Sequence, residues 1–318
     1  MQWKYSVITG FLGRLKDRFI DYHPARQLDE MLAMAARIKG CEGVELVYPQ
    51  DFAEPATVKD LLKQHNLGVA AVNLNVKSED KWRFGSFTNP DPGIRAEAVD
   101  YLRRAMDIAA DLGCNLVTSA FLNDGEDYPF ETDFVAAFDN TVKGVAEGAS
   151  HRDDVRVALE YKASEPRVHC LIGNAGKAAY IAQLTGRDNV GVNVDIGHAL
   201  QSQEIPAESI AFLGATGKLF YVHINDNYRN WDWDLVPGTV NLWDYLELLF
   251  YLRRVGYDGW ITADVFPQRH DQIRVMEKTF EWMDYCIAKV DKLDEKQFVE
   301  MMRTKDAFDM LDAVRELI

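Results

Sequence analysis

The sequence predicts an α/β fold, a (β/α)8 TIM barrel followed by a short helical extension. Short runs rich in β-forming residues alternate with longer amphipathic runs, eight such pairs follow one another, and glycine often separates a helical run from the next strand. Each parallel strand needs a crossover to return the chain, and eight strands close a barrel of this kind. An open doubly wound sheet is the alternative, but no GxGxxG follows the first strand to favour it.

The expected strands and helices alternate along the whole chain. In order, the strands are Trp3–Ile8, Gly43–Tyr48, Gly68–Val76, Leu116–Phe121, Arg156–Lys162, Val190–Asp195, Lys218–Asn225 and Trp260–Phe266. The helices carry apolar residues three and four positions apart, and they are Leu28–Ile38, Val58–His65, Ile94–Leu112, Phe134–Ala149, Gly176–Leu184, Ala207–Leu213, Leu242–Val255 and Gln272–Val290.

The barrel is expected to occupy residues 1–290, and residues 291–318 to form a helical C-terminal extension. Apolar spacing predicts helices at Phe298–Met302 and Ala307–Leu317. The extension has few residues for a core of its own, so we expect it to pack on the barrel or on a neighbouring subunit.

Composition and charge narrow the class of function. Among 318 residues, 50 are acidic and 35 basic, a net charge of −15, which argues against nucleic acid and anionic membranes as partners. The cysteines at 41, 114, 170 and 286 form no CxxC, which indicates reduced thiols. No signal-like segment or membrane-length apolar run is evident. We therefore expect a cytoplasmic enzyme acting on a small molecule.

Four of the later strands each aim a polar side chain at the barrel axis. Because strand side chains alternate between faces, Glu160, Asp195, His223 and Asp264 share the inward face near the strand ends where barrel active sites lie. Three converging carboxylates repel one another unless a cation or a proton neutralises them. An O,O,O,N ligand set suits Mn²⁺, with Mg²⁺ and Co²⁺ as alternatives. The competing interpretation is that each acid forms its own ion pair or helix cap.

A second group of chemically active residues lies close by in sequence. His198 follows Asp195 by three residues, and the loop after the seventh strand contains Asp232 and Asp234. With Asp195 as a bridging ligand they predict a second oxygen-rich ion site, although a DxD is often only a solvated turn. Lys162, on the same face as Glu160, is either a counter-ion or a group that polarises a substrate oxygen.

These segments resemble the xylose isomerase-like barrel superfamily, and within it the two-metal aldose–ketose isomerases of the xylose isomerase and L-rhamnose isomerase types. The resemblance rests on LEYKASEPR, GVNVDIGHALQSQ, GKLFYVHINDN, WDWD and GYDGWITADVFPQRHD, with an earlier echo in GSFTNPDPGIRAEAVD. It covers about half the chain, and its motifs are specific at the level of the superfamily.

The resemblance implies two divalent ions per chain. Glu160, Asp195, His223 and Asp264 would hold the first; the second would be held by Asp195, His198, Asp232 and Asp234, and Lys162 would contact the carbonyl end of an open-chain sugar. Asp195 and His223 are closer to the L-rhamnose isomerase pattern than to that of xylose isomerase. The second strand lacks a histidine that these isomerases use near ring opening, since Val47 or Tyr48 stands there. Homo-dimers or homo-tetramers are implied as well.

The predicted activity is aldose–ketose isomerisation, in which a hydride shifts between adjacent carbons across two metals while Asp232 or Asp234 holds a water that carries the hydroxyl proton. Trp231 or Trp233 would either form a wall of the site or anchor its loop.

A ketose 3-epimerase, in which two glutamates on opposite faces of the sugar exchange a proton, is the enzyme alternative. A barrel that only binds sugar, or serves as a subunit of another enzyme, is the non-catalytic alternative. The endonuclease IV branch is disfavoured, because it needs more histidines than the seven present, for three zinc ions, and a basic surface for DNA, whereas this chain is strongly acidic.

Overall fold

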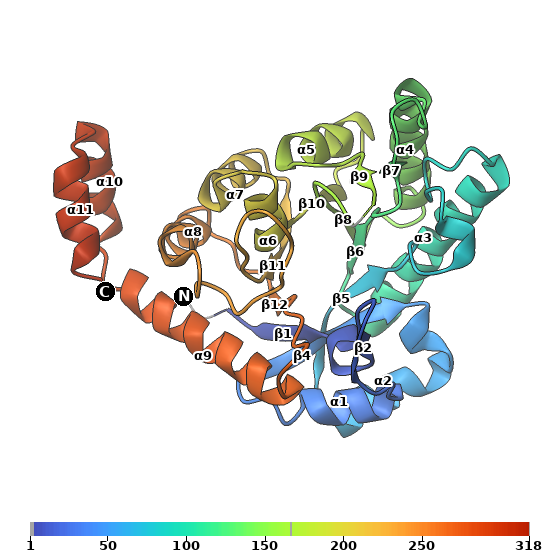
Figure 1. Cartoon of the computed structure of the whole chain (residues 1–318), viewed down its shortest axis with the longest axis horizontal. Coiled ribbons are helices and arrows are strands. Elements are labelled where there is room, and N and C mark those ends of the chain that lie inside the picture. The colour runs from blue at the N-terminus through green and yellow to red at the C-terminus, as the bar shows by residue number, and fades with distance from the viewer. Residues whose placement is uncertain (1–2, 166, 318) are drawn as a thin grey trace.

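A computed structural model describes residues 3–165 and 167–317 and shows a closed eight-stranded parallel barrel ringed by helices (Figure 1). Residues 1, 2, 166 and 318, which fall within the predicted barrel domain and extension, lie outside the described residues. Around the barrel the strands are β1 (Tyr5–Ile8), β4 (Cys41–Tyr48), β5 (Gly68–Leu74), β6 (Leu116–Ala120), β8 (Arg156–Glu160), β10 (Val190–Asp195), β11 (Leu219–Ile224) and β12 (Ile261–Ala263). The (β/α)8 prediction is confirmed.

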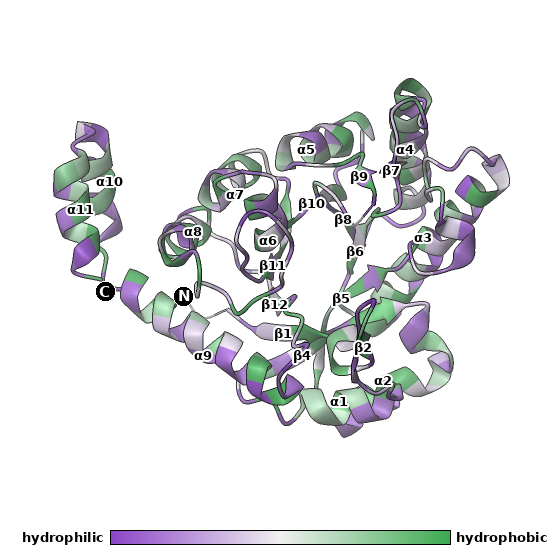
Figure 2. Ribbon diagram, in the orientation of Figure 1, coloured by the Kyte–Doolittle hydropathy of each residue, from purple (hydrophilic) through white to green (hydrophobic). Residues whose placement is uncertain are grey.

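The outer ring consists of amphipathic helices that begin at defined caps. It is formed by α1 (Leu28–Ala35), α2 (Pro55–Gln64), α3 (Pro92–Leu112), α4 (Phe134–Ala149), α5 (Ala175–Leu184), α7 (Pro206–Ala215), α8 (Leu242–Arg254) and α9 (Gln272–Val290). Asp133 caps α4 by accepting backbone N–H groups, and Gly113 ends α3 in the left-handed conformation at φ 73°. Apolar and polar residues alternate around these helices (Figure 2), so that one face packs on the sheet.

Several short elements were not predicted, because they are too short to carry a periodic pattern. They are the one-turn helix α6 (Ile196–Gln201), the hairpin β2 (Leu15–Lys16) and β3 (Asp21–His23), the pair β7 (Gly125–Glu126) and β9 (His169–Cys170), and the 3-10 turns η1 (Thr9–Leu12), η2 (Gln50–Phe52) and η3 (Asp80–Trp82). Of these, η1, β2 and α6 contribute residues to the cavity described below.

The interior of the barrel contains buried polar side chains beside a small apolar cluster that includes Ala71 and Ala158, while the main apolar core lies between strands and helices. On β8, Val157 and Leu159 are buried in that core, whereas Glu160 faces inward. Below the strand ends, Ser6 Oγ lies 2.6 Å from Thr262 Oγ1, which also contacts the hydroxyl of Tyr221. These hydroxyls satisfy one another, as buried polar groups must.

The C-terminal helices α10 (Glu295–Thr304) and α11 (Ala307–Arg315) extend beyond α9, away from the ring of helices (Figure 1). Phe298 of α10 is buried and packs edge-on against Phe250 of α8, with ring centroids 5.3 Å apart. On α11, Phe308 is 80% exposed and Leu311 60% exposed. The extension is therefore tied to the barrel through α10 and leaves an apolar face of α11 open.

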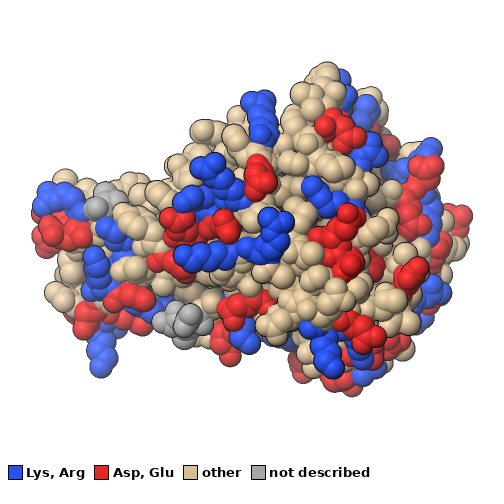
Figure 3. Space-filling model, turned by 90° about the horizontal axis from the view of Figure 1, so that it is seen from below, with Lys and Arg blue, Asp and Glu red and all other residues tan. Residues whose placement is uncertain are grey.

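The described surface is charged and of mixed sign. Acidic and basic side chains are interspersed on the face shown in Figure 3. Ion pairs such as Lys59–Asp111 and Arg103–Glu147 join neighbouring helices. Within residues 3–165 and 167–317, no helix is both long and apolar enough to cross a membrane.

Candidate metal centre

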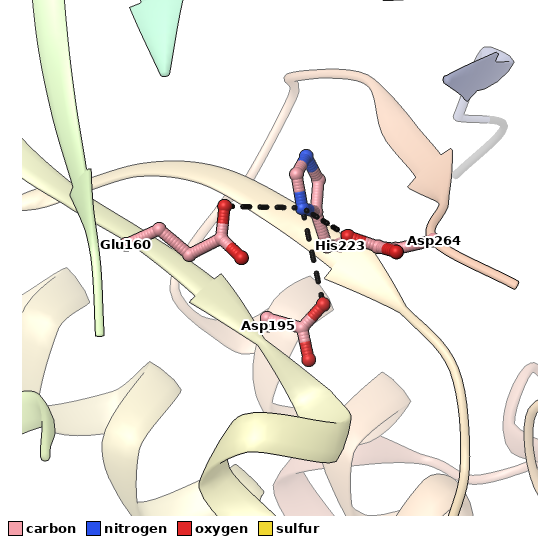
Figure 4. A group of neighbouring side chains, drawn as sticks. All are labelled: Glu160, Asp195, His223 and Asp264. Atoms are coloured by element: carbon pink, nitrogen blue, oxygen red, sulfur yellow. Dashed lines mark ion pairs between the residues drawn. The ribbon is translucent and has the colours of Figure 1, made fainter. Parts of the chain in front are cut away.

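Four side chains meet at the C-terminal end of the barrel, one from each of β8, β10 and β11 and one directly after β12 (Figure 4). Ligand atoms of Glu160, Asp195, His223 and Asp264 all lie within 4.8 Å of one another. His223 Nδ1 is at the centre, 3.2 Å from Asp264, 3.5 Å from Glu160 and 3.8 Å from Asp195. The convergence expected from strand alternation is therefore present in the fold.

Glu45 on β4 orients His223 from below, and the sequence prediction missed it. Its carboxylate is fully buried and lies 2.9 Å from His223 Nε2. Asn73 and Thr118 also donate hydrogen bonds to Glu45, at 2.7 and 2.9 Å. A carboxylate behind a histidine fixes the ring and leaves the other nitrogen for a metal. The signal was a buried-strand pattern in which Glu45 interrupts the apolar run from Val44 to Tyr48.

A second cluster begins where β10 passes into α6. Asp195 is the N-cap of α6 and accepts the backbone N–H of His198 at 2.8 Å. This turn places His198 beside Asp195 and Asp232, and the ligand atoms of these three residues lie within 4.8 Å of one another. His198 Nε2 is 3.1 Å from Asp232. Because Asp195 belongs to both clusters, the two groups are contiguous.

The loop after β11 approaches this cluster closely, and Gly197 makes the approach possible. A Cβ atom at position 197 would lie 2.2 Å from Asn225 Oδ1 and 2.8 Å from Asp232 Oδ1. Asp234 is adjacent: Asn225 Nδ2 donates to it at 3.1 Å, but it is outside the second group of mutually close ligand atoms. The backbone of Asp234 is left-handed at φ 47°, a conformation that aspartate tolerates better than most residues.

Lys162 connects the second cluster to the loop after β8. Its ammonium group lies 2.9 Å from Asp232 and forms a short ion pair with Glu165. The side chain is only 8% exposed, yet it borders the cavity. A buried cation held between two carboxylates has a fixed position from which it can donate a further hydrogen bond.

The two clusters place several carboxylates close together in a buried site, and this shifts the pKa values of their members. Burial, together with the carboxylates of Asp264, Asp232 and Glu160, raises the pKa of Asp195 to about 7, although His198 acts in the opposite direction. Burial alone would lower the pKa of His198, but Asp195 and Asp232 outweigh it and raise that pKa to about 9. Both shifts reflect the buried carboxylates around these residues, whose mutual repulsion a bound cation would relieve.

The donor set fits divalent metal. Buried atoms of the clusters that have no hydrogen-bond partner among the described residues include His198 Nδ1, His223 Nδ1 and Asp232 Oδ1. Orphaned buried lone pairs are costly unless a ligand satisfies them. Carboxylate and imidazole ligands in this ratio suit Mn²⁺, Mg²⁺ or Co²⁺ better than thiophilic ions.

A cavity of about 370 Å³ opens above both clusters. Glu160, Lys162, His198, Asp232, Asp234 and Asp264 line one side, and Phe11 and Phe266 form an aromatic wall. These two rings pack edge-to-face with centroids 5.8 Å apart. Trp233 is 49% exposed, and neither it nor Trp231 is among the described residues that line the cavity. The aromatic wall therefore comes from the loops after β1 and β12.

Comparison with known proteins identifies a family and sugar isomerases similar to this chain. The model of the family described as "Xylose isomerase-like TIM barrel" matches residues 32–286. The xylose isomerase of Thermus thermophilus is 28% identical over 207 residues, which are 63% of this chain and 54% of that protein. A probable sugar isomerase of Mesorhizobium japonicum is 27% identical over 241 residues, 72% of this chain and 54% of that protein. The chain spans about half the length of these relatives.

Solved structures agree with the architecture. D-allulose 3-epimerase from Methylomonas sp. aligns with a TM-score of 0.70 at 20% identity, over 89% of this chain and 96% of that one. An L-ribulose 3-epimerase aligns with a TM-score of 0.69 at 17% identity, over 92% and 96% of the two chains. At such identities the likeness establishes the fold.

Proposed function

We propose that this chain, which belongs to the xylose isomerase-like TIM barrel family, is a divalent-metal-dependent aldose–ketose isomerase. One observation carries the proposal: two clusters of potential ligands share Asp195 and border the same cavity. Two adjacent ions can bind neighbouring oxygens of one open-chain sugar, which is what moving a carbonyl between adjacent carbons requires.

The residues divide into ligands and groups that face the substrate. Glu160, Asp195, His223 and Asp264 would hold one ion, preferably Mn²⁺, and Asp195, His198 and Asp232 the other, with Asp234 beside it. When bound, such ions polarise the sugar carbonyl and stabilise negative charge on its oxygen.

Lys162 and the two loop aspartates are proposed as the catalytic residues. Lys162, fixed by Asp232 and Glu165, donates a hydrogen bond to the carbonyl end of the sugar. Asp232 and Asp234 border the cavity and serve to hold the hydroxyl proton while a hydrogen moves from one carbon to its neighbour. Phe11 and Phe266 exclude water from that transfer.

The ketose 3-epimerase alternative rests on Glu160 and Asp264, which approach His223 from β8 and from the end of β12. An epimerase would use these two carboxylates to remove and return a proton at C3. The second cluster has no part in that chemistry, since one ion suffices there. Its presence favours the isomerase.

The fate of hydrogen separates the two reactions. We would incubate the Mn²⁺-loaded protein in D₂O with aldoses and ketoses of four to six carbons and follow products by NMR. Isomerisation by hydride shift leaves C1 and C2 largely free of deuterium, whereas epimerisation places one deuterium at C3. Intact ion binding without turnover of any free sugar would point to the non-catalytic barrel instead.

A further inference from the structure

The cavity is electrically divided. Its acidic lining residues, Glu160, Asp232, Asp234 and Asp264, all belong to the metal side. The facing side is built by the ends of β4 and β5 and the loop after β1, and among its described lining residues the charged ones are the cations Arg14 and Lys77. A substrate that spans the cavity therefore meets metal ligands at one end and positive charge at the other.

Arg14 is already neutralised by the protein. Its guanidinium forms a two-pronged ion pair with Asp21 of β3, with Nη2 2.7 Å and Nε 3.0 Å from Oδ2. The arginine side chain is 51% exposed. Arg14 and Asp21 together present little net charge to the cavity.

Lys77 is the contrasting case, because its backbone is fixed while its ammonium group has no protein partner. The Lys77 N–H donates to Asn75 Oδ1 at 3.2 Å, and Asn123 Nδ2 donates to the Lys77 carbonyl at 2.9 Å. The residue is partly buried, and among the described residues no hydrogen bond or ion pair reaches its Nζ. The protein thus anchors a cation at the cavity wall without supplying its counter-charge.

We propose that Lys77 binds an anionic group, a carboxylate or a phosphate, on the end of the sugar opposite the reacting carbonyl. The inference rests on the proposed function, because the metal side decides which end reacts. A neutral hydroxyl would accept a hydrogen bond from Lys77, but it would leave the positive charge of the ammonium group without a counter-charge. A cavity of about 370 Å³ has room for a short open-chain sugar with such a terminus.

The test uses polyols, which cannot be isomerised or epimerised. We would titrate the Mn²⁺-loaded protein calorimetrically with ribitol, ribitol 5-phosphate and ribonate. At least one anionic ligand should bind about tenfold to a hundredfold more tightly than ribitol, since a hydrogen bond between charged groups is worth that much. The two anionic arms show whether the terminus is phosphate or carboxylate.

Lys77→Met should abolish that preference while leaving ribitol binding unchanged. Lys63→Met, on the exposed last turn of α2, is the control for the loss of one positive charge and should keep the preference. Equal binding of all three polyols would overturn the inference. So would a preference that survives in Lys77→Met, because the anion would then be bound by the metal ions. Neither result bears on the isomerase proposal, which the hydrogen-transfer experiment decides separately.

Discussion

The two halves of the barrel rim are built on different principles. From β8 to β12, acidic and imidazole side chains stand on the strands or within three residues of them, or on a loop pinned to β11 by the Asp226–Leu235 bridge. From β1 to β6, the cavity is lined by amides, apolar side chains and the cations Arg14 and Lys77. The half from β8 to β12 is suited to metal binding and catalysis, because side chains on strands are placed more rigidly than those on loops. The half from β1 to β6 is suited to determining which substrate binds.

The largest effect is expected at Asp195, the residue common to both clusters. Chelation should abolish turnover, and Mn²⁺ or Co²⁺ should restore it. Asp195→Ala should lose both ions and all measurable activity, because each cluster is left with fewer ligands. Ion content per chain, by plasma emission spectrometry, is the measurement. Asp188→Ala on the exposed surface is the matched control; two ions retained in Asp195→Ala would contradict the bridge.

Gly197→Ala tests whether the second ion can be lost without the first. The added methyl group would lie 2.2 Å from Asn225 Oδ1 and 2.8 Å from Asp232 Oδ1, so this loop must move, and the second ion should be lost while the first stays. Activity should fall by about a hundredfold to a thousandfold, as when one stabiliser of transition-state charge is removed. Gly176→Ala, at an exposed helical position with room for a Cβ, should be neutral. If Gly197→Ala keeps both ions, the loop accommodates the added methyl group and the close approach at Gly197 is not required for the second site.

Glu45→Gln tests whether the other half of the barrel supports the metal half. The amide keeps the shape but removes the negative charge behind His223, so affinity for the first ion should fall by about tenfold to a hundredfold. Competition with a metal indicator measures this, and thermal unfolding checks the fold. Glu42→Gln on the same strand, where the side chain is exposed, should bind ions normally. If the two variants behave alike, Glu45 has only a structural role.

The smallest effect on catalysis is expected from the C-terminal extension. We propose that α10 and α11 form an arm to a neighbouring subunit, because Phe308 and Leu311 are left exposed and such patches favour association. Deleting the residues after Asp291 should lower the mass measured by light scattering and retain the ion sites. Phe308→Ser with Leu311→Ser should act in the same direction. A full-length chain that is monomeric at micromolar concentration would show the extension to be only a cap.

The strands and their inward residues were predictable because burial imposes an alternation of two. Alternation predicted that Asp195 and His223 share the inward face; the register that places them opposite each other was not predicted, because it includes a shift between Val192 and Asn193. His198 and Asp232 were found through their proximity in sequence to strand ends and through family motifs. That these residues bind ions stays a prediction.

Glu45, Phe11 and Lys77 escaped prediction for different physical reasons. Glu45 lies on an early strand outside the family motifs, and its partner His223 is 178 residues away in the sequence. Phe11 is in the short 3-10 turn η1, and Lys77 is in a segment without regular structure. The course of such short segments depends on tertiary contacts, such as the hydrogen bond from Asn123 to the Lys77 carbonyl. No local periodicity encodes such contacts.

The hydrogen bond between Glu45 and His223 joins β4 to β11, strands that are not neighbours in the barrel. The stretch from β8 to β12 contains the proposed ligands, but it lacks Glu45, the carboxylate that orients the imidazole of His223. If the proposed ligands bind ions, tight binding will depend on the closed barrel and not only on the segment that carries the ligands. A half-barrel fragment should bind ions weakly. During refolding, high affinity for ions should appear only when the sheet closes into a barrel.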